Sequence, residues 1–134
     1  IGRGLYGMAE LNAMHEKMNR LLKQVGGRVD SIFFCPHDPT AESCNCRKPL
    51  PGLIDQISER LGMELHGVPF VGDTVTDMNA AVAAGCVPHL VLTGKSEGLR
   101  GKELPPIFPI GTQVHADLNA FVDSLLKKSL DPAL

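Results

Sequence analysis

The chain has 134 residues, a formal net charge of -2, one Tyr and no Trp, and this composition predicts a single aliphatic-core domain over residues 1–134. The small net charge excludes a bulk electrostatic attraction to nucleic acid or to an anionic membrane, so neither is an expected partner. The sequence also contains no apolar run of about eighteen residues, and no transmembrane helix is expected.

The first predicted element is an amphipathic helix from Met8 to Val25, which Gly26 and Gly27 would end. Its apolar residues are three and four positions apart, so we expect this face to pack against the core. A short buried strand is predicted next, from about Val29 to Phe34. It leads directly into a loop that contains cysteine and histidine.

Further helices and strands alternate along the rest of the chain. The predicted elements are a helix from "PLPG" to about Leu61, a strand in "GVPFVGD" at 67–73, a helix from about Val75 to Gly85, a strand in "VPHLVLTG", a Gly/Pro-rich loop over 94–111, and a closing amphipathic helix in "DLNAFVDSLLKK". Asp117 is the expected N-cap of that last helix. The alternation predicts an α/β fold, a Rossmann-like parallel sheet with helices on both faces.

One loop collects three of the four cysteines. Cys35, His37, Cys44 and Cys46 follow the pattern C-x-H-x6-C-x-C. Three thiolates and one imidazole are a normal tetrahedral ligand set for Zn²⁺, and four protein ligands leave no position for a catalytic water. We therefore expect a structural zinc that stabilises the loop 35–46, whereas the alternative is a group of free cysteines with an unrelated histidine.

Two basic residues follow the loop immediately. Arg47 and Lys48 precede a predicted helix start, where an anion is favoured. A lysine that is rigidly placed stabilises the charge that develops on a phosphoryl group during transfer. The competing interpretation is an ordinary solvated basic pair.

Two acidic residues follow the second predicted strand. Asp73 stands at its carboxyl end, where open α/β sheets bind ligands, and hard carboxylate oxygens there suit Mg²⁺. Asp77 lies one helical turn later and can reach the same place. The alternative is that Asp73 only caps the following helix.

These motifs together resemble a known family. The residues "CPH…CNCRKPLPG…FVGDTVTDMNAAVAAG…LVLTGK" are similar to those of the haloacid dehalogenase-like phosphatases, in the histidinol-phosphate phosphatase branch. Within that branch, "AAVAAG" and "LVLTGK" favour the enzymes that act on a sugar bisphosphate on the route to the lipopolysaccharide inner core. The resemblance implies a cytoplasmic, Mg²⁺-dependent phosphomonoesterase that uses an aspartyl-phosphate intermediate, with a small sugar phosphate as its substrate.

The resemblance also implies a role for each candidate residue. Cys35, His37, Cys44 and Cys46 would bind the structural zinc. Lys48 would steady the transferring phosphoryl group, Arg47 would recognise the substrate, and Asp73 would bind the magnesium, so that Lys48 and Asp73 are the expected catalytic residues. Asp77 matches the second acidic residue of the same motif and would support these residues without binding the metal itself. Some relatives have a lysine after the metal-binding aspartate, whereas this chain has Thr74.

An important part of the family pattern does not occur in this sequence. The nucleophile and general acid of the family lie in an aspartate-x-aspartate motif on the first strand, and a phosphate-binding segment lies on the second. In the family topology these two strands separate the strand at 29–34 from the pair at 67–71 and 88–93. We therefore expect the first two strands to be missing from this chain, its sheet to have exposed edges, and the chain to be inactive and unable to hold the fold without an N-terminal segment.

Two other functions remain open at this point. One is a histidinol-phosphate phosphatase, which differs in substrate rather than in mechanism. The other is a catalytically silent, zinc-stapled binding module, since the sequence contains no nucleophile motif.

Overall fold

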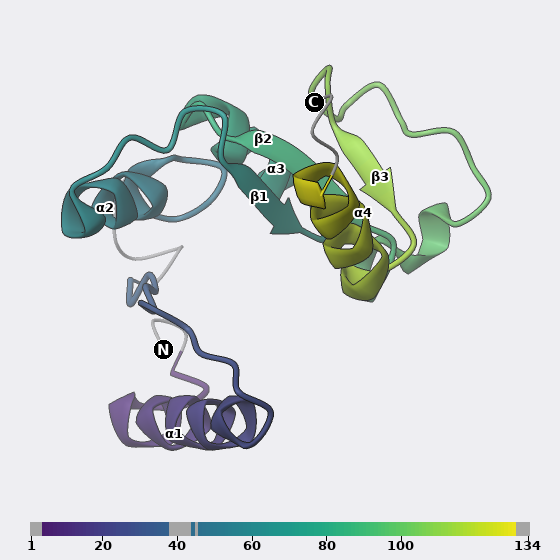
Figure 1. The fold of residues 1–134 in the computed structure, drawn as a ribbon. Helices are drawn as coiled ribbons and strands as arrows, with labels where there is room; N and C mark the ends of the chain where they lie inside the picture. Colours follow the sequence, from purple (N-terminus) through teal and green to yellow (C-terminus); the bar gives the residue numbers. More distant parts are fainter. Residues whose placement is uncertain (1–3, 38–43, 45, 131–134) are drawn as a thin grey trace.

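The fold is described from a computed structural model, in which residues 4–37, 44 and 46–130 are placed. The described residues form, in chain order, α1 (Met8–Gln24), α2 (Gly52–Leu61), β1 (Pro69–Gly72), α3 (Val75–Ala83), β2 (Val87–Val91), the 3-10 helix η1 (Gly94–Leu99), β3 (Gln113–His115) and α4 (Leu118–Leu130). Figure 1 shows the sheet with α3 behind it and α4 in front, while α1 lies apart from both.

The strands form one parallel sheet in the order β1-β2-β3. Successive side chains of a strand point to opposite faces. His89 of β2 contacts the Phe121 ring of α4, so the next residue, Leu90, faces the other side of the sheet. Figure 1 shows that α3 lies on the side opposite to α4. The predicted α/β fold with parallel strands and helices on both faces is confirmed for the described residues.

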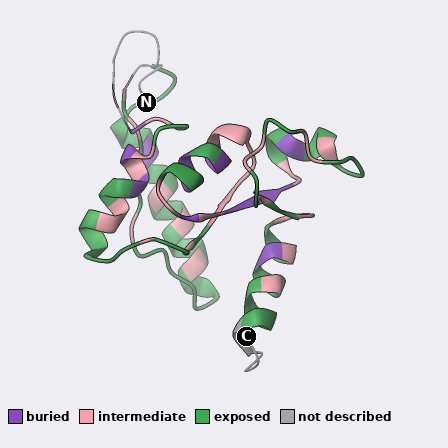
Figure 2. Ribbon diagram, turned by 90° about the horizontal axis from the view of Figure 1, so that it is seen from above, coloured by how far each residue is buried: buried purple, intermediate pink, exposed green. Residues whose placement is uncertain are grey.

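The core lies between α3 and the sheet, where Met78 and Leu90 are fully buried. A cluster on the same side joins Ile54 of α2, Ala80 and Ala81 of α3, and Cys86. The small alanine side chains allow the helix axis to approach the strands closely. Buried residues are accordingly concentrated around the central strand and its helix (Figure 2). Cys86 is therefore a packing residue, as its apolar neighbours in the sequence indicate.

Two predicted helix boundaries are confirmed by local geometry. Gly85 ends α3 with a φ of +81°, in the left-handed region that favours glycine. Asp117 caps α4, because its Oδ1 accepts a hydrogen bond from the Ala120 amide at 2.7 Å. The sequence did not indicate β3, which consists of only three residues, Gln113–His115.

The prediction of a strand at 29–34 is wrong. These residues have no regular secondary structure, and the Ile32 and Phe34 side chains are each 37% exposed. A strand needs a neighbour to satisfy its N–H and C=O groups. Among the residues that the structure places, β1 is the edge of the sheet on this side and pairs with β2 alone. This is the outcome expected if the two strands that separate the segment from β1 are not in the chain.

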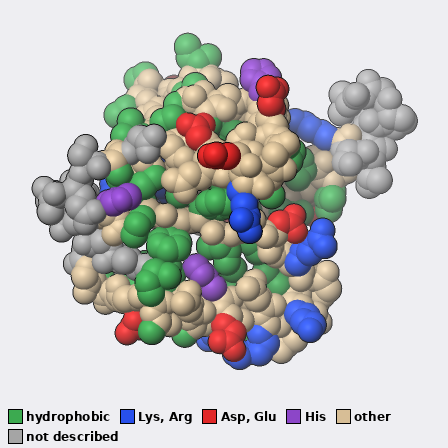
Figure 3. All heavy atoms as spheres, turned by 90° about the vertical axis from the view of Figure 1, so that its left-hand side faces the viewer, with side chains coloured by type: hydrophobic (Ala, Val, Ile, Leu, Met, Phe, Trp, Pro, Cys, Tyr) green, Lys and Arg blue, Asp and Glu red, His purple; other side chains and the backbone are tan. Residues whose placement is uncertain are grey.

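The core-facing face predicted for α1 is also not observed. The helix forms where predicted, but only Leu11 is buried, and Met14 and Leu21 are each 50% exposed. Hydrophobic side chains stand exposed on the face of the molecule that carries α1 and α2 (Figure 3). The amphipathic pattern is therefore present, but no described element covers it.

None of the helices in the described part of the chain is both long enough and apolar enough to cross a membrane.

Candidate active site and metal centre

The predicted zinc ligands converge on one point. The donor atoms of Cys35, His37, Cys44 and Cys46 all lie within 4.8 Å of one another. Cys35 Sγ is 3.6 Å from Cys44 Sγ and 3.1 Å from Cys46 Sγ, and His37 Nδ1 is 3.3 Å from Cys46 Sγ. A tetrahedral zinc with bonds of about 2.0–2.3 Å places its donors about 3.5–3.8 Å apart. The separations of 3.1–3.6 Å are close to this spacing, so the four side chains can hold the ion.

The chemistry of the thiols points to the same ligand. All four cysteines of the chain are free, and a sulfur separation of 3.1 Å is too long for a disulfide. Burial raises the pKa of the Cys46 thiol to about 12, and its hydrogen bonds to Cys35 and Cys44 act in the same direction. Burial also acts to raise the pKa of the Cys35 thiol, but hydrogen bonds from Cys46, His37 and Cys44 outweigh it and lower that pKa to about 6. Three thiols held this closely cannot all ionise unless a cation neutralises them.

The loop with the four predicted zinc ligands is followed directly by Arg47, the residue predicted to recognise the substrate. The Arg47 guanidinium donates a hydrogen bond from Nη2 to the His37 carbonyl at 2.6 Å. Its Nε is buried and has no hydrogen-bond partner among the described residues. An unpaired buried donor is costly, so this position favours an acceptor supplied by a ligand.

Lys48 and Asp77 form an ion pair between Nζ and Oδ1. The Lys48 side chain is 47% exposed, whereas the Asp77 side chain is only 6% exposed. Burial acts to raise the pKa of Asp77, but the hydrogen bond and charge of Lys48, together with the hydrogen bonds to Thr74 and to the Asp73 amide, outweigh burial and hold the pKa below its usual value. The pair keeps Asp77 ionised and fixes the position of the lysine head group.

Asp77 also organises the start of α3. Its Oδ2 accepts hydrogen bonds from the Asp73 and Thr74 amides at 3.1 and 3.2 Å, and the Asp77 amide donates to Thr74 Oγ1 at 3.1 Å. Thr74, rather than Asp73, is therefore the N-cap of the helix. A Cβ at Gly72 would lie 2.5 Å from the Asp77 Cβ, so only glycine fits there.

Asp73 is held by residues of η1, the 3-10 helix that follows the neighbouring strand β2. Its Oδ2 accepts a hydrogen bond from the Lys95 amide at 2.9 Å, and its carbonyl accepts one from Ser96 Oγ at 2.6 Å. Gly94 has a φ of +56°, and a Cβ there would lie 2.3 Å from Asp73 Oδ2. In the described residues these hydrogen bonds use only Oδ2 of the carboxylate, and Oδ1 remains as a potential ligand for a hard cation.

These side chains surround a hollow of about 330 Å³ at the carboxyl end of β1. It is lined by Arg47, Lys48, Asp73, Thr74, Thr76, Asp77 and Lys95. The structure therefore brings together all the residues predicted outside the zinc loop. Reasoning from sequence missed Lys95 and Ser96, although "TGKS" follows the next parallel strand and must meet the same sheet edge.

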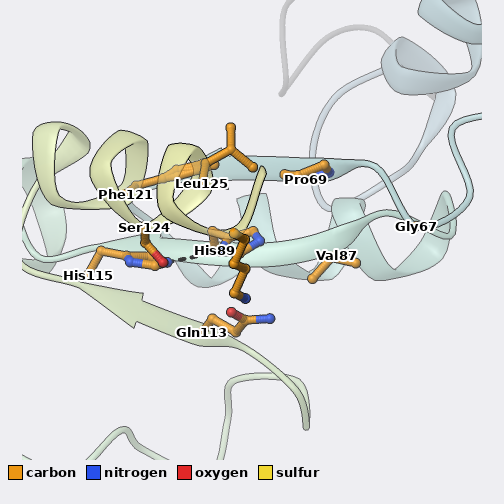
Figure 4. Close-up of a pocket in the computed structure, with 10 residues that line it drawn as sticks. Gly67, Pro69, Val87, His89, Gln113, His115, Phe121, Ser124 and Leu125 are labelled. Atoms are coloured by element: carbon orange, nitrogen blue, oxygen red, sulfur yellow. Dashed lines mark hydrogen bonds between the residues drawn. The ribbon is translucent and has the colours of Figure 1, made fainter. Parts of the chain in front are cut away.

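A second cavity, of about 200 Å³, lies between α4 and the sheet (Figure 4). Its main polar feature is a hydrogen bond at 2.9 Å between His89 Nδ1 and His115 Nε2, beside the Phe121 ring. His89 is buried, and this hydrogen bond satisfies its ring nitrogen. The cavity shares no lining residue with the hollow beside Asp73.

Three comparisons with known proteins agree with this geometry. Residues 45–120 match the HAD-hydrolase-like family. The chain is 47% identical over 129 residues to a D-glycero-beta-D-manno-heptose-1,7-bisphosphate 7-phosphatase of Bordetella bronchiseptica, covering 96% of this chain and 70% of the relative. A protein of the same name from Pseudomonas aeruginosa is 45% identical, covering 95% of this chain and 68% of the relative.

Solved structures show the same similarity. A crystal structure of the B. bronchiseptica D,D-heptose 1,7-bisphosphate phosphatase, complexed with magnesium and phosphate, aligns with a TM-score of 0.83 at 47% identity and covers 94% of this chain and 68% of that one. The enzyme from Burkholderia thailandensis aligns with a TM-score of 0.66 at 41% identity and the same coverage. About a third of each solved chain thus lies outside the matched residues.

Proposed function

Because this chain belongs to the HAD-like phosphatase family, we propose that it supplies part of the active site of a Mg²⁺-dependent phosphatase that removes the 7-phosphate of a heptose 1,7-bisphosphate. The observation that carries the proposal is the meeting of Lys48, Asp73 and Asp77 in one hollow beside Arg47. The names of the relatives supply the substrate. Cytoplasmic lipopolysaccharide core heptose biosynthesis is part of the same proposal.

Asp73 is the proposed magnesium ligand. It is a half-buried carboxylate at the carboxyl end of β1, oriented by the Lys95 amide and by Ser96. Mg²⁺ bound there would neutralise charge on the phosphoryl oxygens. The role of the protein is to hold the carboxylate at a fixed place, and the two hydrogen bonds from the turn after β2 do this.

Lys48 and Arg47 are the proposed phosphate-binding residues. Asp77 keeps the Lys48 ammonium over the hollow, so its charge is oriented before a substrate arrives. The buried Arg47 Nε, which lacks a partner in the described residues, can donate to a phosphate oxygen. The proposed zinc contributes indirectly, because the loop that it stabilises contains the carbonyl to which Arg47 is bound.

The nucleophile is proposed to lie in a segment outside this chain, which spans about 70% of the B. bronchiseptica relative. The chain by itself is accordingly expected to be inactive. The two hypotheses differ for the protein expressed from the complete reading frame, which should be active if the chain is part of a phosphatase and inactive if it is a silent binding module.

The test is phosphate release by the protein from the complete reading frame, with heptose 1,7-bisphosphate and with histidinol phosphate as substrates. We expect Mg²⁺-dependent release from the heptose and little from histidinol phosphate. Asp73→Asn should abolish the release, whereas Asp123→Asn, an exposed position on α4, is the matched control. Unchanged turnover in Asp73→Asn would refute the assignment, and a preference for histidinol phosphate would change the substrate.

A further inference from the structure

The hollow contains one cation that the proposed mechanism does not use. Its lining includes Arg47, Lys48 and Lys95 together with the carboxylates Asp73 and Asp77. The Lys48 charge is paired with Asp77, and the Arg47 guanidinium is bound through Nη2 to a backbone carbonyl of the metal loop. In the part of the chain that the structure describes, the Lys95 ammonium forms no ion pair.

The backbone of Lys95 is fixed relative to the reacting centre. Its amide donates to Asp73 Oδ2 at 2.9 Å. The residue before it, Gly94, has a φ of +56° and makes the close approach to Asp73 possible. The residue after it, Ser96, is buried and binds the Asp73 carbonyl. The Cα of Lys95 is therefore held beside the proposed metal ligand, while its side chain is exposed at the rim.

This arrangement divides the hollow into two parts. Asp73 and the buried Asp77, with Lys48 bound to it, form the part where a phosphoryl group would react. Lys95 stands at the open edge of the same hollow. A monophosphate would need only the inner part. A bisphosphate carries a second dianion, which remains outside when the first is bound and which needs a cation near the rim.

We propose that Lys95 is a specificity residue whose ammonium binds the non-reacting phosphate of a sugar bisphosphate. This inference rests on the proposed function, because it presumes that the substrate carries two phosphates. Lys95 touches the substrate away from the bond that breaks, so it contributes to binding and to the choice of substrate. Lys95 suits this role because its backbone is hydrogen-bonded to Asp73, while its exposed side chain can move to reach the second phosphate.

The experiment compares Lys95→Gln with Lys102→Gln in the protein expressed from the complete reading frame. Lys102 is an exposed lysine after η1 that does not line the hollow. The kcat/KM for heptose 1,7-bisphosphate is divided by that for p-nitrophenyl phosphate. We expect this ratio to fall about 10-fold in Lys95→Gln, mainly through KM, as for a charged hydrogen bond at a solvated rim. Lys95→Arg should restore it, and Lys102→Gln should leave it at the wild-type value.

A second measurement does not depend on turnover. Heptose 1-phosphate, the product that retains the second phosphate, is titrated into the same proteins by calorimetry. Its Kd should rise about 10-fold in Lys95→Gln, and added salt should reduce the difference between wild type and variant.

The outcomes separate the two proposals. If wild-type protein releases no phosphate from the bisphosphate, the proposed function fails, and the product titration still tests Lys95. An unchanged ratio together with an unchanged Kd in Lys95→Gln overturns the inference and leaves the phosphatase assignment intact. Equal losses on both substrates overturn it as well, because Lys95 would then act on the reacting phosphate.

Discussion

Replacing Asp77 with alanine is expected to cost about 3–4 kcal/mol of folding stability. Its Oδ2 accepts hydrogen bonds from the Asp73 and Thr74 amides at 3.1 and 3.2 Å. Each contributes about 1.5 kcal/mol, the lower end of the range for a charged acceptor, because both are long. The ion pair with Lys48 adds only about 0.5 kcal/mol, since the lysine side chain is 47% exposed and water screens the charge.

The assay is urea unfolding near neutral pH of the protein from the complete reading frame. Asp77→Asn keeps an oxygen for the two amides and should lose only about 1–2 kcal/mol. Lys48→Met, combined with each Asp77 variant in a double-mutant cycle, isolates the ion pair and should show a coupling of about 0.5 kcal/mol.

Two results would contradict this reasoning. A loss below about 0.5 kcal/mol in Asp77→Ala would mean that the two amides find other acceptors at no cost. An asparagine variant as unstable as the alanine variant would mean that the negative charge, and not the capping of α3, is what matters at Asp77.

Three further outcomes follow from the described contacts. Elemental analysis should find one zinc per chain. Cys46→Ser or a strong chelator should remove the zinc and lower the midpoint of thermal unfolding. A protein that keeps its midpoint without the metal would contradict the structural role of the zinc. Burial, followed by the neighbouring His115, lowers the pKa of His89 below 6.5, so the unfolded state takes up the proton first and stability should fall as pH drops below about 6.5. His89→Gln should flatten that slope in thermal melts, and an unaltered slope would exclude the histidine pair as its source. Gly72→Ala should destabilise by about 2 kcal/mol or more in urea unfolding, because its methyl group would overlap the Asp77 side chain; a wild-type midpoint would show that the approach is not tight.

The residues of the zinc site could be predicted because their information is local. Cys35 and His37 are separated by one residue, and Cys44 and Cys46 likewise, so a single loop brings the four donors within 4.8 Å. The position of Asp73 could be predicted for a related reason, since an apolar strand that ends in Gly-Asp places the carboxylate at the edge of a parallel sheet. In both cases the chemistry of a short segment was sufficient.

The rest of the hollow depended on contacts between distant segments. Lys95 joins Asp73 across 22 residues through a backbone amide, and Lys48 reaches Asp77 from a different loop. The parallel pairing of β1 with β2 brings Lys95 beside Asp73. Lys48 comes from the segment before α2 and Asp77 from α3, so their contact depends on how these two segments pack.

The sequence by itself determined the metal loop, the helices and the strand that leads to Asp73, because periodicity and ligand spacing act over a few residues. Only the tertiary structure decided that residues 29–34 are not a strand and that the apolar face of α1 is uncovered. Both of these features require a partner that lies beside them, and a pattern in one segment does not state whether such a partner is present.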